Sequence, residues 1–460
     1  MIYCAKIFII KGDAVTVRDF IINESRRRGR GITVSLIGFG VTNKAVFEKI
    51  SDHCSVTVRS QNEVILPEGC TGYFGDGYLS EIFEDVLFLS PSVRKDMPEI
   101  QNARNRGISV TSECEVFFMG APEDGRRIFA VTGSDGKTTV TCMAAAMLSA
   151  RAVGNIGVPF SHFEGERDYV SELSSFNLYD FKPHSKAAVI TSLSPNHLNW
   201  HKDLSEYYST KLGIFENADR RVIYAGGDCL SFIHNGDTLF SLKSSKSDLL
   251  RLGAGHTIYI NRDVIFYDDE PIIATSDLSL CEGHNILNFM AAIGLVHGYA
   301  DTHRIRDVAR SFRTPRHRCE RVHTSFDGTV FIDSSIDTTP TRTMATLYGI
   351  GKPVFLILGG RGKGLSPLPL YDPIKKYATG ILAYGDFGAE IVDFFSGYND
   401  LSTIPIIFRN RLSDGLDELK NVIRVGQTVV LSPSATAYGE FENFEKRGDF
   451  FADYVKKHFP

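Results

Sequence analysis

The sequence predicts an α/β protein of three domains: a Rossmann-like N-terminal domain, a central P-loop-type mononucleotide-binding ATPase domain and a C-terminal Rossmann-like α/β domain. Three observations lead to this prediction. The chain has 460 residues, of which 43% are hydrophobic, enough for two or three cores. Short apolar runs typical of buried strands alternate with helical patterns along most of its length. Glycine-rich turns join a strand to a helix near residues 38 and 133.

The N-terminal domain is predicted to span residues 1–121, with residues 1–30 an unassigned leader. A strand over 32–37 enters the turn Gly38-Phe-Gly40-Val-Thr-Asn43, and a helix follows. Asn43 replaces the third glycine of a dinucleotide-binding turn, and Ser60 stands where an acidic ribose ligand is expected. The turn is therefore weak evidence for a nucleotide and argues against a dinucleotide cofactor. Further strands are expected over 56–59 and 86–90.

The central domain is predicted to span residues 122–313 after a polar linker at 121–125. Its expected strands lie at 127–132 and 187–192, and its closing helix at 285–297. The C-terminal domain is predicted over residues 314–460. Its expected strands cover 329–332, 354–358, 380–384 and 428–431.

Composition and targeting signals limit the functional class. Charged residues make up 23% of the chain and the net charge is −5, which does not indicate a nucleic-acid partner. The eight cysteines have no C-x2-C spacing, so zinc is not expected. A disulfide framework is not expected in a chain of this length with an ordinary core composition. Residues 7–10 are too short an apolar run for a signal peptide, and no segment approaches the roughly 20 apolar residues of a membrane helix. We expect a cytoplasmic protein with no membrane insertion.

The strongest motif runs from Val131 to Thr139, Val-Thr-Gly-Ser-Asp-Gly-Lys-Thr-Thr, between a strand and a helix. Glycines let the backbone approach phosphate oxygens, and amides at a helix N-terminus point toward them. Lys137 supplies a cation, and the Thr138 hydroxyl can hold Mg²⁺. Val131 stands where a full Walker A motif has glycine. The alternative is a glycine turn with an incidental lysine.

Three polar segments of the central domain are candidates for metal and substrate binding: 154–157, 171–177 and 194–201. Glu172 and His197 have ligand types suited to a metal ion. The alternative for each is structural, a capping serine or a satisfied histidine. Lys211 lies on the flank of a helix expected over 204–216, where a lysine usually extends to water but could point toward the phosphate site.

Ten segments occur in the order and spacing of a known family. They are TGSDGKTT, GNIG, SELSSFNL, SPNHLNWH, YYSTKLGIF, GHNILN, PRHRCERV, DSSIDTTP, LILGGRGKG and LSPSATAYGEFENFEKRGDFF. With these residues the chain resembles the Mur ligase family from about residue 32 onward. SELSSFNL, LILGG followed by Lys363, and NFEKRGD are most similar to its D-glutamate-adding members.

The resemblance implies an activity. It implies ATP-dependent addition of D-glutamate to UDP-N-acetylmuramoyl-L-alanine through an acyl phosphate, a cytoplasmic step of peptidoglycan synthesis and so of cell-wall biogenesis, cell shape and cell division. ATP and Mg²⁺, with two ions, are the implied cofactors. The three small-molecule substrates are the implied partners, and a monomer is expected.

The resemblance also implies residue roles. Catalytic roles fall to Lys137, Glu172, His197 and Lys211. ATP-binding roles fall to Gly133, Ser134, Asp135, Gly136, Lys137, Thr138, Thr139, Asn285, Asn288, Arg318 and Asp333, with His317 beside them. The UDP-muramoyl substrate is assigned to Val41, Thr42, Ser60, Asn155, Ser174 and Asn177, and D-glutamate to Lys363 and Phe444. Metal ligation is assigned to Thr138, Glu172, His197 and Lys211, the last as an N-carboxylated lysine.

Departures from the family pattern lie at Asn199, Ser335, Asp337 and Ala437, mostly near the expected amino-acid site. They leave the acceptor open. The alternatives are a ligase of the Mur or folylpolyglutamate type with another acceptor, and a non-enzymatic ATP-binding relative. A further alternative, an NAD-dependent oxidoreductase, is suggested only by the turn Gly38-Phe-Gly40.

Overall fold

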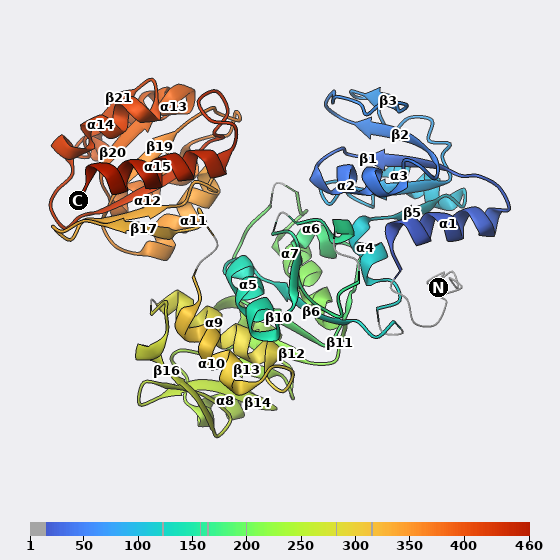
Figure 1. Cartoon of the computed structure of the whole chain (residues 1–460), viewed down its shortest axis with the longest axis horizontal. Helices are drawn as coiled ribbons and strands as arrows, with labels where there is room; N and C mark the ends of the chain where they lie inside the picture. Colours follow the sequence, from blue (N-terminus) through green and yellow to red (C-terminus); the bar gives the residue numbers. More distant parts are fainter. Residues whose placement is uncertain are drawn as a thin grey trace. The chain divides into compact units, whose positions relative to one another are not determined.

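The computed structural model describes residues 15–121, 124–156, 158–162, 165–198, 200–281, 283–313 and 316–460, without the side chains of residues 341, 345 and 349. The chain divides into two compact units, a first unit (Met1–Phe312) and a second unit (Arg313–Pro460). Figure 1 colours the first from blue to yellow and the second from orange to red. Both contain largely parallel sheets covered by helices, so the predicted α/β class is confirmed.

The first sheet has five parallel strands in the order β3-β2-β1-β4-β5. Its strands are β1 (Thr33–Ile37), β2 (Ser55–Ser60), β3 (Thr71–Phe74), β4 (Val86–Leu89) and β5 (Ser109–Thr111), and its later helices are α2 (Val41–Ile50), α3 (Pro98–Asn105) and α4 (Glu113–Phe118). Strands β1, β2 and β4 match the expected ones. Strands β3 and β5 were not predicted, because Thr71–Phe74 and Ser109–Thr111 are short and expose part of their side chains.

The supposed leader contains an ordered helix, α1 (Val17–Arg28), drawn in dark blue in Figure 1. Thr16 and Asp19 form a reciprocal capping box at its start. Val17, Phe20 and Ile21 are buried in the core of the first sheet, where they remove apolar surface from water. The helix is therefore an integral part of the first unit. Residues 1–14 of the leader lie outside the described residues.

The second sheet also belongs to the first unit and has nine strands, in the order β16-β15-β14-β13-β12-β10-β6-β8-β7. Its parallel strands are β6 (Arg127–Thr132), β7 (Arg151–Gly154), β8 (Asp168–Glu172), β10 (Ala187–Ile190), β12 (Arg221–Tyr224), β13 (Thr238–Phe240) and β14 (His256–Asn261). Strands β15 (Val264–Tyr267) and β16 (Glu270–Ala274) are antiparallel additions at one edge. A separate pair joins β9 (His184–Ser185) and β11 (Asn217–Ala218).

Helices cover both faces of the second sheet, and each face has its own apolar core. The helices are α5 (Lys137–Leu148), α6 (Ser175–Leu178), α7 (Leu204–Leu212), α8 (Lys246–Arg251), α9 (Gly283–Val296) and α10 (Thr302–Ser311), with 3-10 turns η1 (Phe160–His162), η2 (Gly213–Phe215), η3 (Gly227–Phe232) and η4 (Thr275–Asp277). The helix expected over 204–216 ends as α7 at Leu212 and continues as the 3-10 turn η2.

The second unit has one sheet of six strands in the order β17-β18-β22-β19-β20-β21, antiparallel only between β17 and β18. The strands are β17 (Glu320–Thr324), β18 (Val330–Asp333), β19 (Val354–Gly359), β20 (Ala378–Tyr384), β21 (Ile406–Arg409) and β22 (Thr428–Ser434). The helices are α11 (Pro340–Ile350), α12 (Tyr371–Tyr377), α13 (Gly385–Ser396), α14 (Leu412–Val422) and α15 (Phe444–His458), with 3-10 turns η5 (Leu368–Leu370) and η6 (Asn399–Leu401).

Each of the three predicted domains contains one of these sheets. The predicted boundaries at 121/122 and 313/314 adjoin residues 122–123 and 314–315, which lie outside the described residues. The three-domain division therefore stays a prediction. Among the described residues, no helix combines the length and apolar character that a bilayer crossing requires.

Candidate functional site

The glycine turn 133–136 connects β6 to α5 in the first unit. Gly133 and Gly136 have φ values of +151° and +78°, a region that side chains disfavour. A Cβ on Gly133 would lie 2.0 Å from Thr191 Oγ1, and one on Gly136 would lie 2.3 Å from Asn288 Oδ1. Glycine is thus required at both positions. Because α5 begins at Lys137, the free amides of its first turn face the turn, as an anion-binding site needs.

Hydroxyl groups from other elements hold the turn in place. The Ser134 hydroxyl donates to the Ser194 carbonyl at 2.9 Å and lies 3.2 Å from the Tyr207 hydroxyl of α7. Thr191, directly after β10, donates to the Asp135 carbonyl. Sequence reasoning missed Tyr207 and Thr191. The position of Thr191 at the end of an expected strand was a usable signal, whereas nothing in the sequence indicates that Tyr207 contacts the turn.

Two lysines approach the turn from different elements. Lys137 Nζ donates to the carbonyls of Gly133 and Ser134, both at 2.9 Å. Lys211 Nζ, from the last turn of α7, donates to the Gly133 carbonyl at 2.8 Å. Lys211 is 2% exposed, so the inward orientation considered from the sequence is the observed one.

Burial changes the acid–base character of Lys211. Desolvation lowers its pKa well below the ordinary value of 10.5, and the nearby charge of Lys137 lowers it further. Glu172 and Asp135 act in the opposite direction but do not outweigh burial. A lowered pKa increases the fraction of the amine that is neutral and nucleophilic at a given pH.

Oxygen atoms gather beside the first turn of α5. The Thr138 hydroxyl donates to Glu172 Oε2 at 2.7 Å, and the Asn155 amide donates to Glu172 Oε1 at 2.9 Å. Glu172 ends β8, next to β6 in the sheet, and is 2% exposed. A hydroxyl and a buried carboxylate are hard oxygen donors of the kind that Mg²⁺ takes. The donor set therefore fits a magnesium ion beside the glycine turn.

His197 is exposed, and its ring lies among aromatic side chains. Its ring lies 4.9 Å from the Phe176 ring and 6.3 Å from the Tyr207 ring, centroid to centroid. Its backbone has a positive φ of 54°, uncommon outside glycine. Asn199, in the same segment, lies outside the described residues.

Ser174 and Asn177 have a structural function in α6. The Ser174 hydroxyl accepts from the Asn177 amide N–H, and the Asn177 side chain accepts from the Ser174 N–H, a reciprocal capping box. Both side chains are partly exposed. Asn177 also lines a small pocket with Ser90 and Lys95, which follow β4.

Val41, Thr42 and Ser60 lie at one edge of the first sheet. Val41 and Thr42 begin α2 after β1, and Ser60 ends β2, the parallel neighbour of β1. The carboxyl ends of neighbouring parallel strands are where α/β sheets bind ligands. The structure thus brings these three residues to the same edge.

Asn285 and Asn288 lie on one face of α9. Their side chains are joined by a 3.5 Å hydrogen bond. The contact of Asn288 with Gly136 places this face directly beside the glycine turn. The predicted grouping of the asparagines with the phosphate motif is therefore observed in space.

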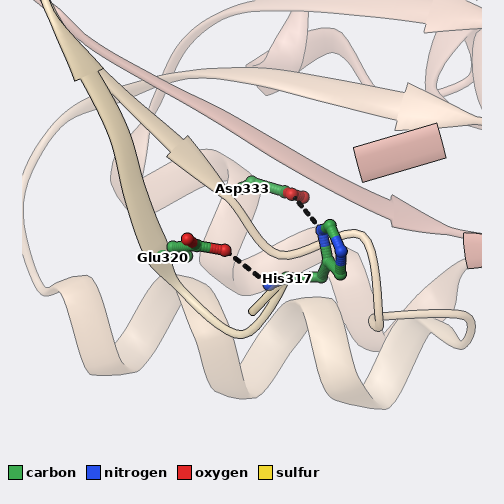
Figure 2. A group of neighbouring side chains, drawn as sticks. All are labelled: His317, Glu320 and Asp333. Carbon is green, nitrogen blue, oxygen red and sulfur yellow. Dashed lines mark hydrogen bonds and ion pairs between the residues drawn. The ribbon is translucent and has the colours of Figure 1, made fainter. Parts of the chain in front are cut away.

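In the second unit, His317, Glu320 and Asp333 form a compact group, shown in Figure 2. His317 Nδ1 lies 2.6 Å from Asp333 Oδ2, and the His317 N–H donates to Glu320 Oε2 at 2.8 Å. Asp333 is fully buried, and its other oxygen accepts from the Ser335 N–H. All three could ligate a metal, but His317 Nδ1 already pairs with Asp333, and Glu320 accepts from the backbone N–H of His317. Arg318, next to His317, is partly buried.

Positive charge gathers near the predicted amino-acid site. Lys363 is exposed and donates to the Thr338 hydroxyl at 3.2 Å. Partial desolvation of its amine lowers the pKa of Lys363, and the charges of Arg342 and Arg447 lower it further. Phe444 begins α15, with its ring 6.2 Å from that of His317.

The departures from the family pattern in the second unit are interior residues. Ser335, Asp337 and Ala437 are all buried. Ser335 accepts from the buried guanidinium of Arg447, and Asp337 accepts from two hydroxyls, those of Thr346 and Ser432. The polar side chains of Ser335 and Asp337 are therefore hydrogen-bonded within the second unit.

Comparison with known proteins agrees with this arrangement. Residues 131–296, which include the glycine turn, Glu172 and Lys211, match the Mur ligase middle domain. The UDP-N-acetylmuramoylalanine–D-glutamate ligase of Clostridium novyi is 33% identical over 95% of this chain and 98% of its own. That of Acetivibrio thermocellus is 32% identical over 94% and 98%.

A solved structure shares the fold. The UDP-N-acetylmuramate–alanine ligase of Thermotoga maritima aligns with a TM-score of 0.56 and 19% identity, covering 93% of this chain and 99% of its own. The domain match and the full-length relatives together show that the chain belongs to the Mur ligase family.

Proposed function

We propose that this chain is an ATP-dependent ligase that joins D-glutamate to UDP-N-acetylmuramoyl-L-alanine in peptidoglycan synthesis. Curated relatives that bear this activity in their names align with nearly the whole chain. The observation that carries the proposal is the meeting of Lys137, Thr138, Glu172 and Lys211 around one glycine turn. That cluster combines phosphate-binding amides, two amines and a buried carboxylate.

The proposed reaction has two steps. The substrate carboxylate attacks the γ-phosphorus of ATP, and the bond from this phosphorus to the β,γ-bridging oxygen breaks. ADP departs as the leaving group, and the substrate becomes an acyl phosphate. The amine of D-glutamate then attacks the acyl carbon, loses a proton, and the tetrahedral intermediate expels phosphate. The first step needs positioning and charge neutralisation more than covalent help. Amides of the glycine turn and Lys137, which would exchange its carbonyl partners for phosphate, supply both.

Metal binding is assigned to Thr138, Glu172, His197 and Lys211, with two magnesium ions. Mg²⁺ supplies neutralisation of phosphate charge when bound. The Thr138 and Glu172 oxygens, 2.7 Å apart, support one site. His197 would join them from a ring that packs against Phe176.

Lys211 is proposed to be N-carboxylated. Its neutral amine attacks CO2, a carbon–nitrogen bond forms, and one proton is released. The product is an anion at a position where burial disfavours a free ammonium. Glu172 and this carbamate would then present two anions to the metal.

The remaining sites follow the same proposal. ATP contacts are assigned to the turn residues 133–139, to Asn285 and Asn288, and to Arg318 and Asp333. The nucleotide-sugar substrate is assigned to Val41, Thr42, Ser60, Asn155, Ser174 and Asn177. D-glutamate is assigned to Lys363 and Phe444, where the cations beside Lys363 suit a dicarboxylate.

The protein is further proposed to act as a cytoplasmic monomer of three domains, 1–121, 122–313 and 314–460. A mass in solution near the 51.1 kDa of one chain is expected. Light scattering after gel filtration measures it, and twice that value contradicts the monomer.

The deciding test is phosphate release from ATP and Mg²⁺ with UDP-N-acetylmuramoyl-L-alanine, comparing D-glutamate with a panel of other amino acids. Turnover that requires D-glutamate supports both the chemistry and the acceptor. Turnover with another acceptor keeps the chemistry and rejects D-glutamate. Failure with every acceptor, in protein that binds ATP, favours the non-enzymatic alternative.

A further inference from the structure

Arg94 lies in the loop between β4 and α3 and bonds to the part of the first unit that carries the glycine turn. Its guanidinium donates to both oxygens of Glu206 in α7, each at 3.0 Å. It also donates to both oxygens of Asp96, each at 2.8 Å, and to the Tyr179 hydroxyl at 2.7 Å. Two bidentate carboxylate pairs on one arginine form a geometry that a lysine cannot reproduce.

Aromatic rings enclose the same guanidinium. Its carbon lies 4.5 Å from the Tyr179 ring centroid and 4.9 Å from that of Trp200. It also donates to the Trp200 carbonyl at 2.8 Å, while the Trp200 indole N–H donates to the Ser92 carbonyl at 2.9 Å. Cation–π contacts gain strength when partly desolvated, and Arg94 is 18% exposed. The segment with Trp200 is thus tied to the loop of Arg94 in both directions.

From Trp200, contacts continue to the candidate active site. The Phe176 ring lies 4.8 Å from Trp200 and 4.9 Å from His197. The backbone N–H of Trp200 donates to the His197 carbonyl at 3.0 Å. His201 continues the path to Tyr207, whose hydroxyl contacts the glycine turn. Arg94 therefore holds the backbone of Trp200, which in turn bonds to the backbone of His197.

Glu206 ties this network to the helix of Lys211. It lies in the first turn of α7, and Lys211 lies in the last. Arg94 is the main cause that lowers the pKa of Glu206 to about 2, so this carboxylate stays ionised at neutral pH. The pair is only partly exposed, 18% and 19%, and is screened less than a surface pair.

We propose that Arg94 is a positioning residue that joins the first sheet, with its nucleotide-sugar edge, to the His197 segment and to α7. The kinetic part of this proposal rests on the proposed ligase function. The physical reason is distance control: acyl phosphate formation requires the substrate carboxylate to meet the γ-phosphate. The sugar nucleotide is assigned to one side of the Arg94 contacts, and the glycine turn lies on the other. Small misplacements of reacting groups reduce rates strongly.

The chain offers a direct reporter, because Trp200 is its single tryptophan. The test compares Arg94→Gln and Arg94→Lys with Arg104→Gln as matched control. Arg104 links the same parts of the first unit through Asp180 at 3.1 Å, but the two side chains are 31% and 59% exposed. An exposed single ion pair contributes little.

For Arg94→Gln we expect Trp200 emission at longer wavelength and stronger quenching by acrylamide. We also expect kcat/KM for the nucleotide sugar to fall by about 100-fold, while the KM for ATP stays within about twofold because the glycine turn keeps its Ser194 bond. Arg94→Lys should show the same changes to a smaller extent. Arg104→Gln should change neither the Trp200 emission nor kcat/KM for the nucleotide sugar.

Unchanged emission and kinetics in Arg94→Gln would overturn the proposal, as would equal effects from Arg104→Gln. A rise in the ATP KM equal to that for the sugar would also overturn it, since a general loss of structure predicts that result. If Arg94→Gln does not fold, Arg94→Lys decides by the same emission and KM criteria. Wild-type protein without turnover would reject the ligase function, whereas the emission comparison would still decide the contact role of Arg94.

Discussion

At the scale of single residues, burial sets the chemistry of Lys211. Lys211 is 2% exposed, and desolvation lowers the pKa of its amine well below 10.5, although the amine donates to a backbone carbonyl. The proposed carboxylation would convert the buried amine into an anion that a metal ion could neutralise. A metal ion held by the Thr138 and Glu172 oxygens would neutralise this anion.

Lys211→Met should abolish ligase turnover while preserving the fold, because methionine fills the same buried volume without the amine. Loss of about 4 kcal/mol of charge stabilisation corresponds to about a 10³-fold lower kcat. Carbon-13 NMR of protein kept in labelled bicarbonate should show a carbamate signal in the wild type. The signal should be absent from Lys211→Met and retained in Lys457→Met, a change at an exposed lysine. A wild-type protein that is active but gives no carbamate signal contradicts the assignment.

The His317–Asp333 pair gives the second prediction at this scale. Burial lowers the pKa of His317, but the bond and charge of Asp333 outweigh burial, so the pKa lies above 6.5. A raised folded-state pKa adds stability that is fully present below the unfolded value of about 6.5 and is lost as pH rises through the folded value. In Asp333→Asn burial remains and the pKa of His317 falls, so the variant instead gains stability as pH rises toward about 6.5.

Melting temperatures of wild type and Asp333→Asn between pH 5.5 and 8.5 check this sign. The difference between them should be largest at the acidic end and shrink as pH rises. In a His317→Gln background, Asp333→Asn should lose this pH-dependent part. A difference that grows with pH would show that Asp333 does not raise the pKa of His317.

Residue types and spacing could predict which side chains lie near the glycine turn, but not the hydrogen bonds and ring contacts that the other candidate residues form. Lys137, Glu172 and Lys211 follow from the motif and the resemblance. The capping box of Ser174 and Asn177, and the aromatic packing of His197, depend on local backbone geometry that a sequence pattern does not specify. Arg94 belongs to no motif, because its partners other than Asp96 lie 85 to 112 residues away along the chain.

At the scale of elements, the glycine turn shows how one backbone position can carry two constraints. Gly125 and Gly136 have almost the same φ, +79° and +78°. A Cβ on Gly125 meets nothing within 4 Å, whereas one on Gly136 meets Asn288 of α9 at 2.3 Å. The two positions therefore separate backbone strain from the close packing of α9 against the turn.

Gly125→Ala should cost about 1 kcal/mol, the usual penalty for a side chain at positive φ, and leave ATP binding unchanged. Gly136→Ala should cost more and should also raise the Kd for ATP by at least about tenfold, equivalent to 1.4 kcal/mol. Thermal unfolding and calorimetric titration with a non-hydrolysable ATP analogue measure the two effects. Equal ATP affinity in both variants would mean that contact between α9 and the turn is unimportant for nucleotide binding.

Element prediction worked best where apolar runs are long and buried. Strands β4, β6, β10, β19 and β22 are almost entirely buried and were expected from their apolar runs. Helix α1 was not expected, because only three apolar residues form its buried face and a run of basic residues follows them in the sequence. Its position depends in part on Asp85, just before β4, which forms ion pairs with Arg28 at the end of the helix and with Arg30 just after it.

At the scale of the whole molecule, the two units have separate apolar cores. Units with separate cores can unfold in separate calorimetric transitions. A ligand stabilises only the unit it contacts, by about 2.7 kcal/mol when its concentration is 100 times its Kd. The proposed ATP contacts come from both units: Lys137 and Asn288 in the first, Arg318 and Asp333 in the second. The number of transitions that ATP shifts therefore tests the assignment.

With Mg²⁺ and a non-hydrolysable ATP analogue at 100 times its Kd, we expect both transitions of the wild-type chain to move to higher temperature. Lys137→Met should remove both shifts, because it weakens phosphate binding itself. Arg318→Gln should remove only the shift of the second unit, since the glycine turn is intact and only the remote contact is lost. Each transition can be assigned by Phe331→Leu, which weakens the core of the second unit alone. If the wild type shows a shift in the first unit only, Arg318 and Asp333 do not bind ATP.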